Sequence, residues 1–498
     1  MTTIQHIIGG KRTSGASGKA QTVYNPATGE EVAQVVLGAT AEVEAAVMAA
    51  KQAFPAWSAT SPAKRSNVMF ALRAVMLRRA DDIASTISAE HGKTHEDALG
   101  EVSRALEVVE YACGIADKLK GDFSRDVGPG IDTTAERQPL GVVAGITPFN
   151  FPTMVPLWMI PMALSCGNCF ILKPSERDPS SANLIFDMFQ EAGLPDGVLN
   201  VVHGGKEAVD ALIAHKDVSA LSFVGSTPIA HYIYSQGCAA GKRVQALGGA
   251  KNHMIILPDA DIDQAADALM GAGFGSAGER CMAISVAVPV GEETADRLIE
   301  RLVPRVQALK IGPSTDPDAE MGPVITREAQ QRIESMISTG EREGAKVLVD
   351  GRGFKLQGYE NGFWVGGTLL DRVTEDMTVY QQEIFGPVLS VLRADSYEAA
   401  VDLINKHQYG NGTAIFTRDG DAARDFSRRI QVGMVGINVP IPVPVGYHSF
   451  GGWKQSIFGA HGIYGPEAIH FYTRLKTVTS RWPTGIRSGA EFTFPRMG

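Results

Sequence analysis

Apolar residues recur at helical spacing in the N-terminal part of the chain, after a region rich in turns. Residues 1–35 contain many Gly and Ser residues between short polar and apolar runs, which predicts short strands joined by turns. Between Thr40 and Phe54 an apolar side chain returns every three or four positions, which predicts a helix. The same spacing in 65–85 and 101–118 predicts two further helices.

Short apolar runs alternate with helical segments from residue 141 onward. The predicted strands of a first series are 141–146, 169–173, 198–202 and 220–224; those of a second are 253–257, 284–290, 345–349, 388–392 and 413–416, with helices at 293–309 and 326–343. Alternation of this kind builds βαβ units, so the fold class is α/β, with two mainly parallel sheets covered by helices. Ligands of such sheets bind beyond the carboxyl ends of the strands.

The segment 469–479 alternates apolar and polar residues, which is typical of a strand at the edge of a sheet. Exposed edges often pair with another chain, so this strand is a candidate subunit contact. The alternative is an ordinary edge strand within one monomer.

Composition narrows the class of protein. The chain has 498 residues, 44% hydrophobic and 20% charged, which predicts a globular protein of two or three domains. A net charge of −9 argues against nucleic acid as the main partner. The N-terminal residues show no secretory signal, and the apolar segment 151–164 is too short to cross a membrane. We therefore expect a cytoplasmic protein with no membrane contact.

The five cysteines are too few for a disulfide framework in a chain of this length, which fits a reducing compartment. Cys166 and Cys169 form a C-x-x-C pair, a spacing found in redox and zinc sites. No second pair exists, and the two lie between an apolar helix and a buried strand, so we interpret them as structural and expect no metal site. Cys113 and Cys238 are expected to be small buried apolar residues.

Six motifs then resemble the aldehyde dehydrogenase superfamily. They are Thr147–Pro152, Leu172–Glu176, Phe223–Thr227, Leu247–Gly249, Gly278–Ala283 and Glu383–Pro387, and they occur in the order of that family over nearly the whole chain. Within the superfamily the chain is most similar to the CoA-acylating branch that acts on methylmalonate semialdehyde. Asn150–Trp158, Gly278–Ala283 and the lack of Glu at position 246 carry this closer resemblance.

The resemblance implies a domain organisation. An NAD-binding domain of Rossmann type would comprise residues 1–118 and 138–249, and residues 446–468 would return to it. A second α/β domain, the catalytic one, would span 250–445. Residues 119–137 and 469–498 would form a small β oligomerisation element, and the family expectation is a homodimer or homotetramer.

The resemblance also assigns the catalytic residues. The thiolate of Cys281 would add to the aldehyde carbonyl, and hydride transfer to NAD would leave a thioacyl-enzyme. Because a free thiol has a pKa of about 8.5, nearby cations or dipoles are expected to favour the thiolate. The side-chain amide of Asn150 and the backbone N–H of Cys281 would donate to the oxyanion; one such donor is worth roughly 2.7–4 kcal/mol in a transition state. From sequence alone, Asn150 is equally well read as a residue shaping the turn before Pro152.

NAD would be bound by a variant of the usual motif, because no G-x-G-x-x-G follows the first strand. Lys173 and Glu176 would contact the adenosine ribose, where a carboxylate disfavours NADP. Gly225 and Ser226 open a helix that suits a pyrophosphate, although Ser226 alone would be read as a helix N-cap. The remaining predicted cofactor contacts are Phe149, Glu383 and Phe385.

A substrate with an acidic end needs a cation. Arg104, on a predicted helix, would face the substrate entrance, and Arg280 flanks the nucleophile. Two arginines can bind one carboxylate by charge-assisted hydrogen bonds. Without the resemblance, Arg104 would be read as a solvated surface residue.

Most of the superfamily hydrolyses its thioester with a Glu just before Leu-Gly-Gly, but this chain has Ala246 there and Gln245 before it. Loss of a general base slows attack by water roughly 10²–10⁴-fold, whereas a thiol ionises more easily. The resemblance therefore implies acyl transfer to CoA, with decarboxylation when the substrate is malonate or methylmalonate semialdehyde. The alternatives are hydrolysis to a free acid, for instance if Glu279 reached the thioester, and a non-catalytic binding protein on this fold.

Overall fold

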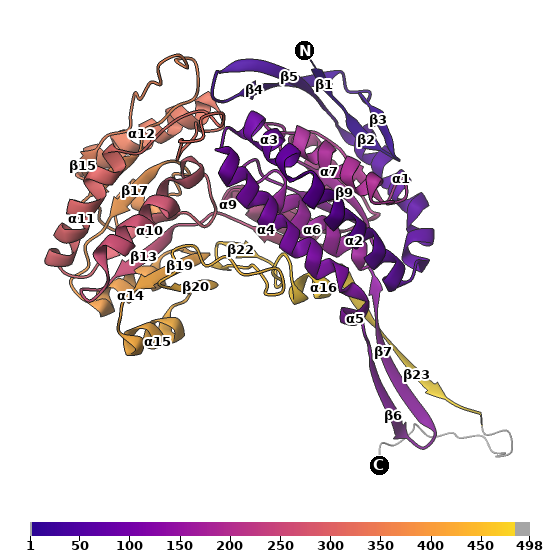
Figure 1. Cartoon of the computed structure of the whole chain (residues 1–498). Coiled ribbons are helices and arrows are strands. Elements are labelled where there is room, and N and C mark those ends of the chain that lie inside the picture. Colours follow the sequence, from indigo (N-terminus) through magenta and orange to yellow (C-terminus); the bar gives the residue numbers. More distant parts are fainter. Residues whose placement is uncertain (1, 484–498) are drawn as a thin grey trace.

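The computed structural model describes residues 2–483, which form two α/β units and a projecting arm (Figure 1). The first unit is built on an eight-stranded sheet in the order β22-β12-β11-β8-β9-β10-β2-β3. Its strands are β22 (Ile457–Phe458), β12 (Arg243–Leu247), β11 (Val218–Val224), β8 (Val142–Ile146), β9 (Cys169–Lys173), β10 (Leu199–Val201), β2 (His6–Ile8) and β3 (Lys11–Thr13). The central five strands are parallel: four of them were predicted, and β12 was not, whereas β2 and β22 are antiparallel to their neighbours.

Helices cover the first sheet, and one of them is buried on all sides. The helices are α1 (Thr40–Ala59), α2 (Pro62–Arg78), α3 (Ala80–His91), α4 (His95–Cys113), α5 (Ile115–Lys118), α6 (Met154–Ser165), α7 (Ser180–Glu191), α8 (Lys206–Ala214), α9 (Thr227–Ala239) and α16 (Pro466–Tyr472). Every residue of α6 is buried, which explains why its sequence is apolar all round. Trp158 of α6 packs against Phe450 and Tyr464, and so ties the returning C-terminal segment to this core.

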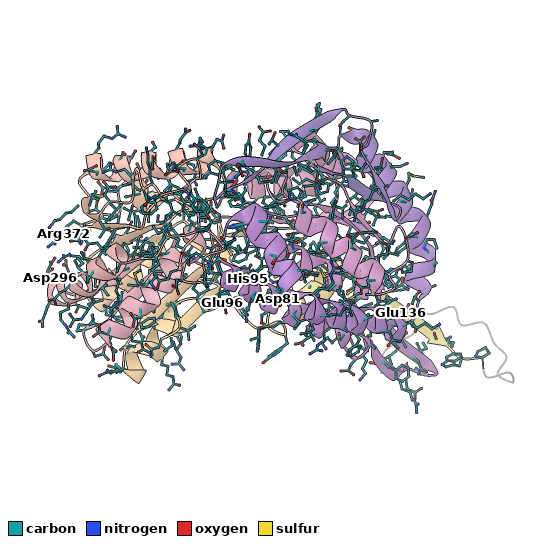
Figure 2. The ribbon with its side chains drawn as sticks, turned by 45° about the horizontal axis from the view of Figure 1, so that its top comes forward. Asp81, His95, Glu96, Glu136, Asp296 and Arg372 are labelled. Atoms are coloured by element: carbon teal, nitrogen blue, oxygen red, sulfur yellow. The ribbon has the colours of Figure 1, made fainter. Side chains whose placement is uncertain are left out.

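The second unit has a seven-stranded sheet in the order β15-β16-β17-β14-β13-β19-β20. Its strands are β15 (Lys346–Val349), β16 (Thr368–Asp371), β17 (Val388–Val391), β14 (Ile284–Pro289), β13 (Asn252–Ile256), β19 (Gly412–Phe416) and β20 (Met434–Ile437); its helices are α10 (Ile262–Phe274), α11 (Glu292–Gln307), α12 (Arg327–Glu343), α13 (Thr378–Gln381), α14 (Tyr397–Lys406) and α15 (Gly420–Arg429). All strands but β15 are parallel to their neighbours. Asp296 and Arg372 lie at the outer end of this unit, far from the arm (Figure 2).

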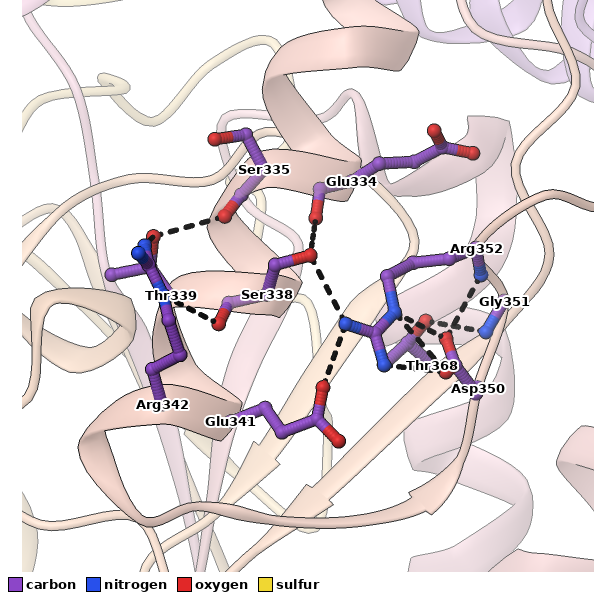
Figure 3. A network of polar contacts seen from close by, with 10 residues as sticks. All are labelled: Glu334, Ser335, Ser338, Thr339, Glu341, Arg342, Asp350, Gly351, Arg352 and Thr368. Atoms are coloured by element: carbon purple, nitrogen blue, oxygen red, sulfur yellow. Dashed lines mark hydrogen bonds and ion pairs between the residues drawn. The ribbon is translucent and has the colours of Figure 1, made fainter.

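Helix α12 is important because its first turns face the candidate site. Arg352 fastens the turn after β15 to this helix (Figure 3). Its guanidinium lies 2.6 Å from Asp350 and 2.7 Å from Glu341, and it donates to the Ser338 hydroxyl at 3.0 Å. This network fixes the C-terminal half of α12 against the sheet.

The arm is a three-stranded antiparallel sheet that projects from the body (Figure 1). Strand β7 (Ile131–Pro139) lies in its centre, between β6 (Asp122–Gly128) and β23 (Thr473–Arg481). Two smaller sheets complete the fold, one of β1 (Thr2–Ile4), β5 (Glu30–Leu37) and β4 (Lys19–Asn25), the other of β18 (Tyr409–Gly410) and β21 (Trp453–Lys454). Of the predicted oligomerisation element, residues 484–498 lie outside the described residues.

Three predicted boundaries were wrong. The segment 65–85 is not one helix, because α2 ends at Arg78 and α3 begins at Ala80. The helix predicted at 101–118 begins six residues earlier, at His95, and is divided at Gly114. Residues 469–472 belong to α16 rather than to the edge strand, because Pro466 starts a helix whose apolar residues pack into the core. Within residues 2–483, no helix is both long and apolar enough to span a bilayer.

Candidate active site

Two cavities meet at Cys281, and between them they contain most of the predicted site residues. The first has a volume of about 450 Å³. It is lined by Pro148, Phe149, Asn150, Arg177, Val224, Gly225, Ser226, Gly248, Gly249, Cys281, Thr326, Glu328, Ala329, Arg332, Glu383 and Phe385. Val224 ends β11, and the 147–150 turn follows β8, so this cavity lies at the carboxyl ends of parallel strands.

Cys281 stands on a tightly turned loop after α10. Ser276, Ala277 and Gly278 all have positive φ, at 53°, 51° and 70°. A Cβ at Gly278 would overlap the carbonyl oxygen of Gly386, so only glycine fits and the two loops touch. Non-glycine residues in this region of φ/ψ space typically store about 1–3 kcal/mol of strain each, and such strain is common at functional sites.

Two asparagines that the sequence did not single out fix the backbone at Cys281. The side-chain amides of Asn252 and Asn411 donate to the Cys281 carbonyl at 2.9 and 3.0 Å. Asn252 also donates to the Ala283 carbonyl at 2.9 Å. These contacts hold the peptide group that joins Cys281 to Met282. Asn411 carries no sequence signal, because its partner lies 130 residues away in the chain.

The surroundings of Cys281 do not favour its thiolate, contrary to the expectation from sequence. Burial, with a smaller effect of the Glu383 carboxylate, raises the pKa of Cys281 to about 12, and Arg280 is the weakest of the groups that lower it. These protein groups alone therefore leave the thiol protonated at neutral pH.

Asn150 is buried directly beside Cys281 in the first cavity. Within residues 2–483 its side-chain amide has no hydrogen-bonding partner, whereas its backbone carbonyl accepts a hydrogen bond from Lys93 at 2.7 Å. The amide is thus available to a ligand, as an oxyanion donor must be.

The predicted cofactor residues divide between the first cavity and its surroundings. Ser226 occupies the N-cap position of α9 and lines the first cavity, and within residues 2–483 its hydroxyl makes no capping hydrogen bond. Phe149 and Phe385 meet edge to face at 5.8 Å, and Phe385 has a positive φ of 53°. Glu383 accepts the Ala250 N–H at 2.9 Å, and burial raises its pKa to about 7.

Lys173 and Glu176 do not line the first cavity. Lys173, at the end of β9, donates to the Glu176 carboxylate at 3.2 Å and to the Gly204 carbonyl at 2.8 Å. Glu176 lines a neighbouring cavity. Arg177 and Thr326 line both this cavity and the first one. The pair stands at the carboxyl edge of the sheet, where a ribose would be expected.

The second cavity lies on the other side of Cys281 and has a volume of about 340 Å³. One face of α4 contributes Asp97, Glu101 and Arg104, which follow helical spacing. The other residues are Gly100, Phe151, Met154, Trp158, Arg280, Cys281, Met282, Ile441, Val443 and Phe450. An apolar pocket with two arginines suits a short acyl chain that ends in a carboxylate.

Both arginines of the second cavity already have acidic partners. Arg280 lies 2.5 Å from Asp97, and a Cβ at Gly275 would lie only 2.6 Å from its guanidinium. Arg104 lies 2.8 Å from Glu107 and donates to the carbonyls of Val443 and Pro444 at 2.9 Å. A substrate carboxylate would therefore share these guanidinium groups with protein acceptors.

Residue 246 cannot act as a general base, because it is an alanine. Ala246 is fully buried in β12, in register with Phe223 and Phe458, and lines neither cavity. Gln245 uses its amide inside the protein: it accepts from the Ser222 hydroxyl at 2.8 Å and donates to two carbonyls of the 459–465 loop.

Glu279 is fully buried and lines neither cavity, although it neighbours Arg280 in sequence. One oxygen accepts the Ile325 N–H at 3.4 Å, and the other lies 3.9 Å from the His91 ring. Burial raises the pKa of Glu279 to about 8.

All five cysteines are free thiols. Cys166 and Cys169 are buried, and burial raises the pKa of each to about 12. Cys113 is buried as expected, but the expectation for Cys238 was wrong. Cys238 is exposed because it lies on the outer face of the last turn of α9.

Comparison with known proteins agrees with this geometry. The profile of the aldehyde dehydrogenase family matches residues 13–478. A malonate-semialdehyde dehydrogenase of Pseudomonas aeruginosa is 57% identical over 498 residues, the whole of both chains. The acylating, mitochondrial methylmalonate-semialdehyde dehydrogenase of Arabidopsis thaliana is 48% identical over 97% of this chain and 80% of its own.

A crystal structure from Sinorhizobium meliloti, provisionally assigned as a methylmalonate-semialdehyde dehydrogenase and complexed with NAD, has a TM-score of 0.97. It is 59% identical and covers 98% of this chain and 99% of its own. Sequence, fold and the two cavities at Cys281 agree: the chain belongs to the aldehyde dehydrogenase family.

Proposed function

We propose that this protein oxidises malonate or methylmalonate semialdehyde with NAD and transfers the acyl group to CoA. The observation that carries the proposal is the position of Cys281 between two cavities. One is lined by Asn150 and by most of the predicted cofactor residues, and the other is mainly apolar with two arginines and two acidic residues. The relatives named for malonate and methylmalonate semialdehyde support the substrate class.

The first cavity fits NAD. The free Ser226 hydroxyl and the N-terminus of α9 suit a pyrophosphate, and the Phe149–Phe385 pair forms an aromatic wall near Cys281. When bound, NAD supplies the hydride acceptor. The positive charge of the nicotinamide ring would also favour the thiolate of Cys281, which burial disfavours.

The proposed reaction proceeds in four steps. The thiolate of Cys281 adds to the aldehyde carbon, and the new oxyanion accepts hydrogen bonds from the Asn150 amide and the Cys281 N–H. Loss of hydride to NAD leaves a thioester on Cys281. The acyl group is now of malonyl type, so its carboxylate leaves as CO₂ and the resulting enolate takes up a proton. Attack by the CoA thiolate releases acetyl-CoA or propionyl-CoA and returns the Cys281 thiolate.

Hydrolysis to a free acid is the second candidate, and one observation favours it. Glu383 lines the same cavity as Cys281 and has a pKa raised to about 7 by burial, which suits a general base. Its hydrogen bond to the Ala250 N–H and its predicted contact with the cofactor ribose argue against this role.

The test is to mix enzyme, NAD and malonate semialdehyde with and without CoA, and to follow NADH together with the carbon products. Steady turnover that requires CoA and yields acetyl-CoA is the expected result. Equally fast turnover without CoA, with accumulation of a free acid, would overturn the acylating proposal in favour of hydrolysis. No NADH with either semialdehyde would favour a binding protein.

We also propose the predicted division into an NAD-binding domain, a catalytic domain and an oligomerisation element. The arm supports the last of these, because its open edges carry the exposed apolar side chains of Phe123, Leu475 and Val478. Such edges favour pairing with a second copy, and we propose a homodimer or homotetramer. The five free thiols suit a reducing compartment, for which we propose the cytoplasm.

A further inference from the structure

A buried ion pair, Lys93–Glu101, holds both ends of the turn that carries Asn150. The Lys93 Nζ lies 2.8 Å from Glu101 Oε2, and both side chains are fully shielded from solvent. Lys93 follows α3 directly, beyond Gly92, whose φ of 91° ends that helix, and Glu101 lies in α4. Neither residue was singled out from the sequence.

Each partner of the pair bonds a different end of the turn. Lys93 donates to the Asn150 carbonyl at 2.7 Å, and its ammonium lies 4.3 Å from the centroid of the Phe151 ring. The free oxygen of Glu101 accepts the N–H groups of Thr153 and Met154 at 2.8 and 3.0 Å. Thr153 is the N-cap of α6 but makes no side-chain capping bond, so Glu101 caps this helix from outside.

We propose that Lys93 and Glu101 are positioning residues that aim the Asn150 amide at the oxyanion. An oxyanion donor is effective only if it is fixed before charge develops, and the Asn150 amide has no partner of its own within residues 2–483 that could fix it. The orientation of the Asn150 amide therefore depends on the backbone of the turn. Lys93 holds this backbone at Asn150, and Glu101 holds it at Thr153 and Met154. This inference rests on the proposed role of Asn150.

The experiment is a double-mutant cycle between Lys93→Met and Asn150→Ala. The readout is the first-turnover rate of NADH formation with excess semialdehyde, with NAD affinity and thermal stability measured in parallel. Removal of one oxyanion donor lowers a rate roughly 10²–10³-fold. We expect Lys93→Met to lose a comparable factor in the wild-type background and less than about threefold in the Asn150→Ala background. Lys93→Arg is expected to recover part of the rate.

The outcomes separate the two proposals. If Asn150→Ala leaves the first-turnover rate unchanged, the proposed role of Asn150 fails. If Asn150→Ala lowers the rate and Lys93→Met lowers it by the same factor in both backgrounds, only the positioning role fails. If Lys93→Met does not fold, Glu101→Gln replaces it in the same cycle, because it keeps an acceptor for the two N–H groups but removes the charge.

An independent cluster lies at the base of the arm. His461, Glu467 and His470 place one ligand atom each within 4.8 Å of one another. Glu467 Oε2 lies 2.7 Å from the His461 Nδ1, and Glu467 Oε1 lies 3.5 Å from the His470 Nδ1. Ligand atoms around a tetrahedral zinc ion are about 3.3 Å apart, given metal–ligand distances of about 2.0–2.2 Å. The observed distances lie on either side of this value.

Two side chains of β12 hold the backbone of this cluster. Gln245 donates to the His461 carbonyl at 3.2 Å, and Arg243 donates to the His470 carbonyl at 2.9 Å. Two imidazoles and one carboxylate are a ligand set that suits Zn²⁺ and leaves a fourth position for water. We infer that this cluster binds a zinc-type divalent cation and fastens α16 to the 459–465 loop. The fold creates this site: residues 461 and 467 meet only because the loop turns back onto α16.

The test is a titration of chelator-treated protein with Zn²⁺ alone, carried out on Cys281→Ser so that the active-site thiol does not compete. We expect one tightly bound ion per chain, a raised Tm, and an affinity at least about tenfold weaker in His470→Ala and Glu467→Gln. His231→Ala removes an exposed histidine outside the cluster and is the matched control. Binding that is equally tight in all these variants, or less than one ion per chain, would overturn the assignment.

Discussion

Replacement of Arg280 by methionine tests how the second cavity recognises its substrate. Arg280 is the cation of that cavity nearest to Cys281 in the chain, and its side chain is 20% exposed, so its hydrogen bonds are only partly screened by water. A hydrogen bond to a charged group contributes about 1.5–3 kcal/mol. Its loss therefore predicts a decrease of roughly 10- to 150-fold in kcat/KM for malonate semialdehyde.

The Asp97 carboxylate adds a second effect that the structure allows us to separate. In Arg280→Met this carboxylate loses its partner and repels the acidic end of the substrate. Asp97→Asn/Arg280→Met removes the repulsion and is expected to regain part of the loss. The assay is steady-state NADH formation with both substrates, malonate semialdehyde and propanal, in the presence of CoA.

Propanal is the matched control because it has no carboxylate. Its kcat/KM is expected to change less than about threefold in Arg280→Met. If propanal and malonate semialdehyde lose the same factor, Arg280 acts through the geometry or the pKa of Cys281 and not through the substrate carboxylate. That result would refute the proposed recognition.

Four further predictions concern other parts of the molecule. Trp158→Ala, which removes a buried side chain that packs against Phe450 and Tyr464, is expected to lower the free energy of unfolding by about 3–5 kcal/mol in urea titrations. Burial raises the folded-state pKa of Glu279 to about 8, above its unfolded value, so its contribution to stability is present at low pH and is lost as the pH rises toward 8. The stability of Glu279→Gln relative to wild type, measured by thermal melts, should therefore increase between pH 5 and pH 8. Alkylation of Cys281 by iodoacetamide without NAD should rise about tenfold per pH unit from pH 7 to 10, because its pKa is raised to about 12. Leu475→Glu on the arm is expected to lower the molar mass measured by light scattering.

Each of these has an outcome that would contradict it. A loss below about 1 kcal/mol for Trp158→Ala would mean that the core collapses around the site. A constant difference between Glu279→Gln and wild type across pH would show that this carboxyl group is ionised throughout. A plateau of alkylation near pH 8, absent from Cys281→Ser, would mean that the thiolate is already favoured without cofactor. An unchanged molar mass for Leu475→Glu would place subunit contacts away from the arm.

Much of the fold follows from the sequence because buried strands leave a local signature. The strand predicted at 169–173 has the observed limits, since all five of its residues are buried and flanked by turns. Where tertiary packing decides, the prediction fails. Ile469 and Phe471 alternate with polar residues like a strand, yet both are buried in a short helix that Pro466 begins.

The chemical identity of the site is likewise contained in the sequence, because a nucleophile and an oxyanion donor are recognised by residue type within a motif. Cys281 and Asn150 were predicted for these roles in this way, and the fold places both in one cavity. Their environment is decided by contacts between residues far apart in the chain. Arg280 is paired with Asp97 across 183 residues, and the Asn150 turn is held by Lys93 across 57. Electrostatic energy and pKa depend on such neighbours and on burial, which only the tertiary structure supplies.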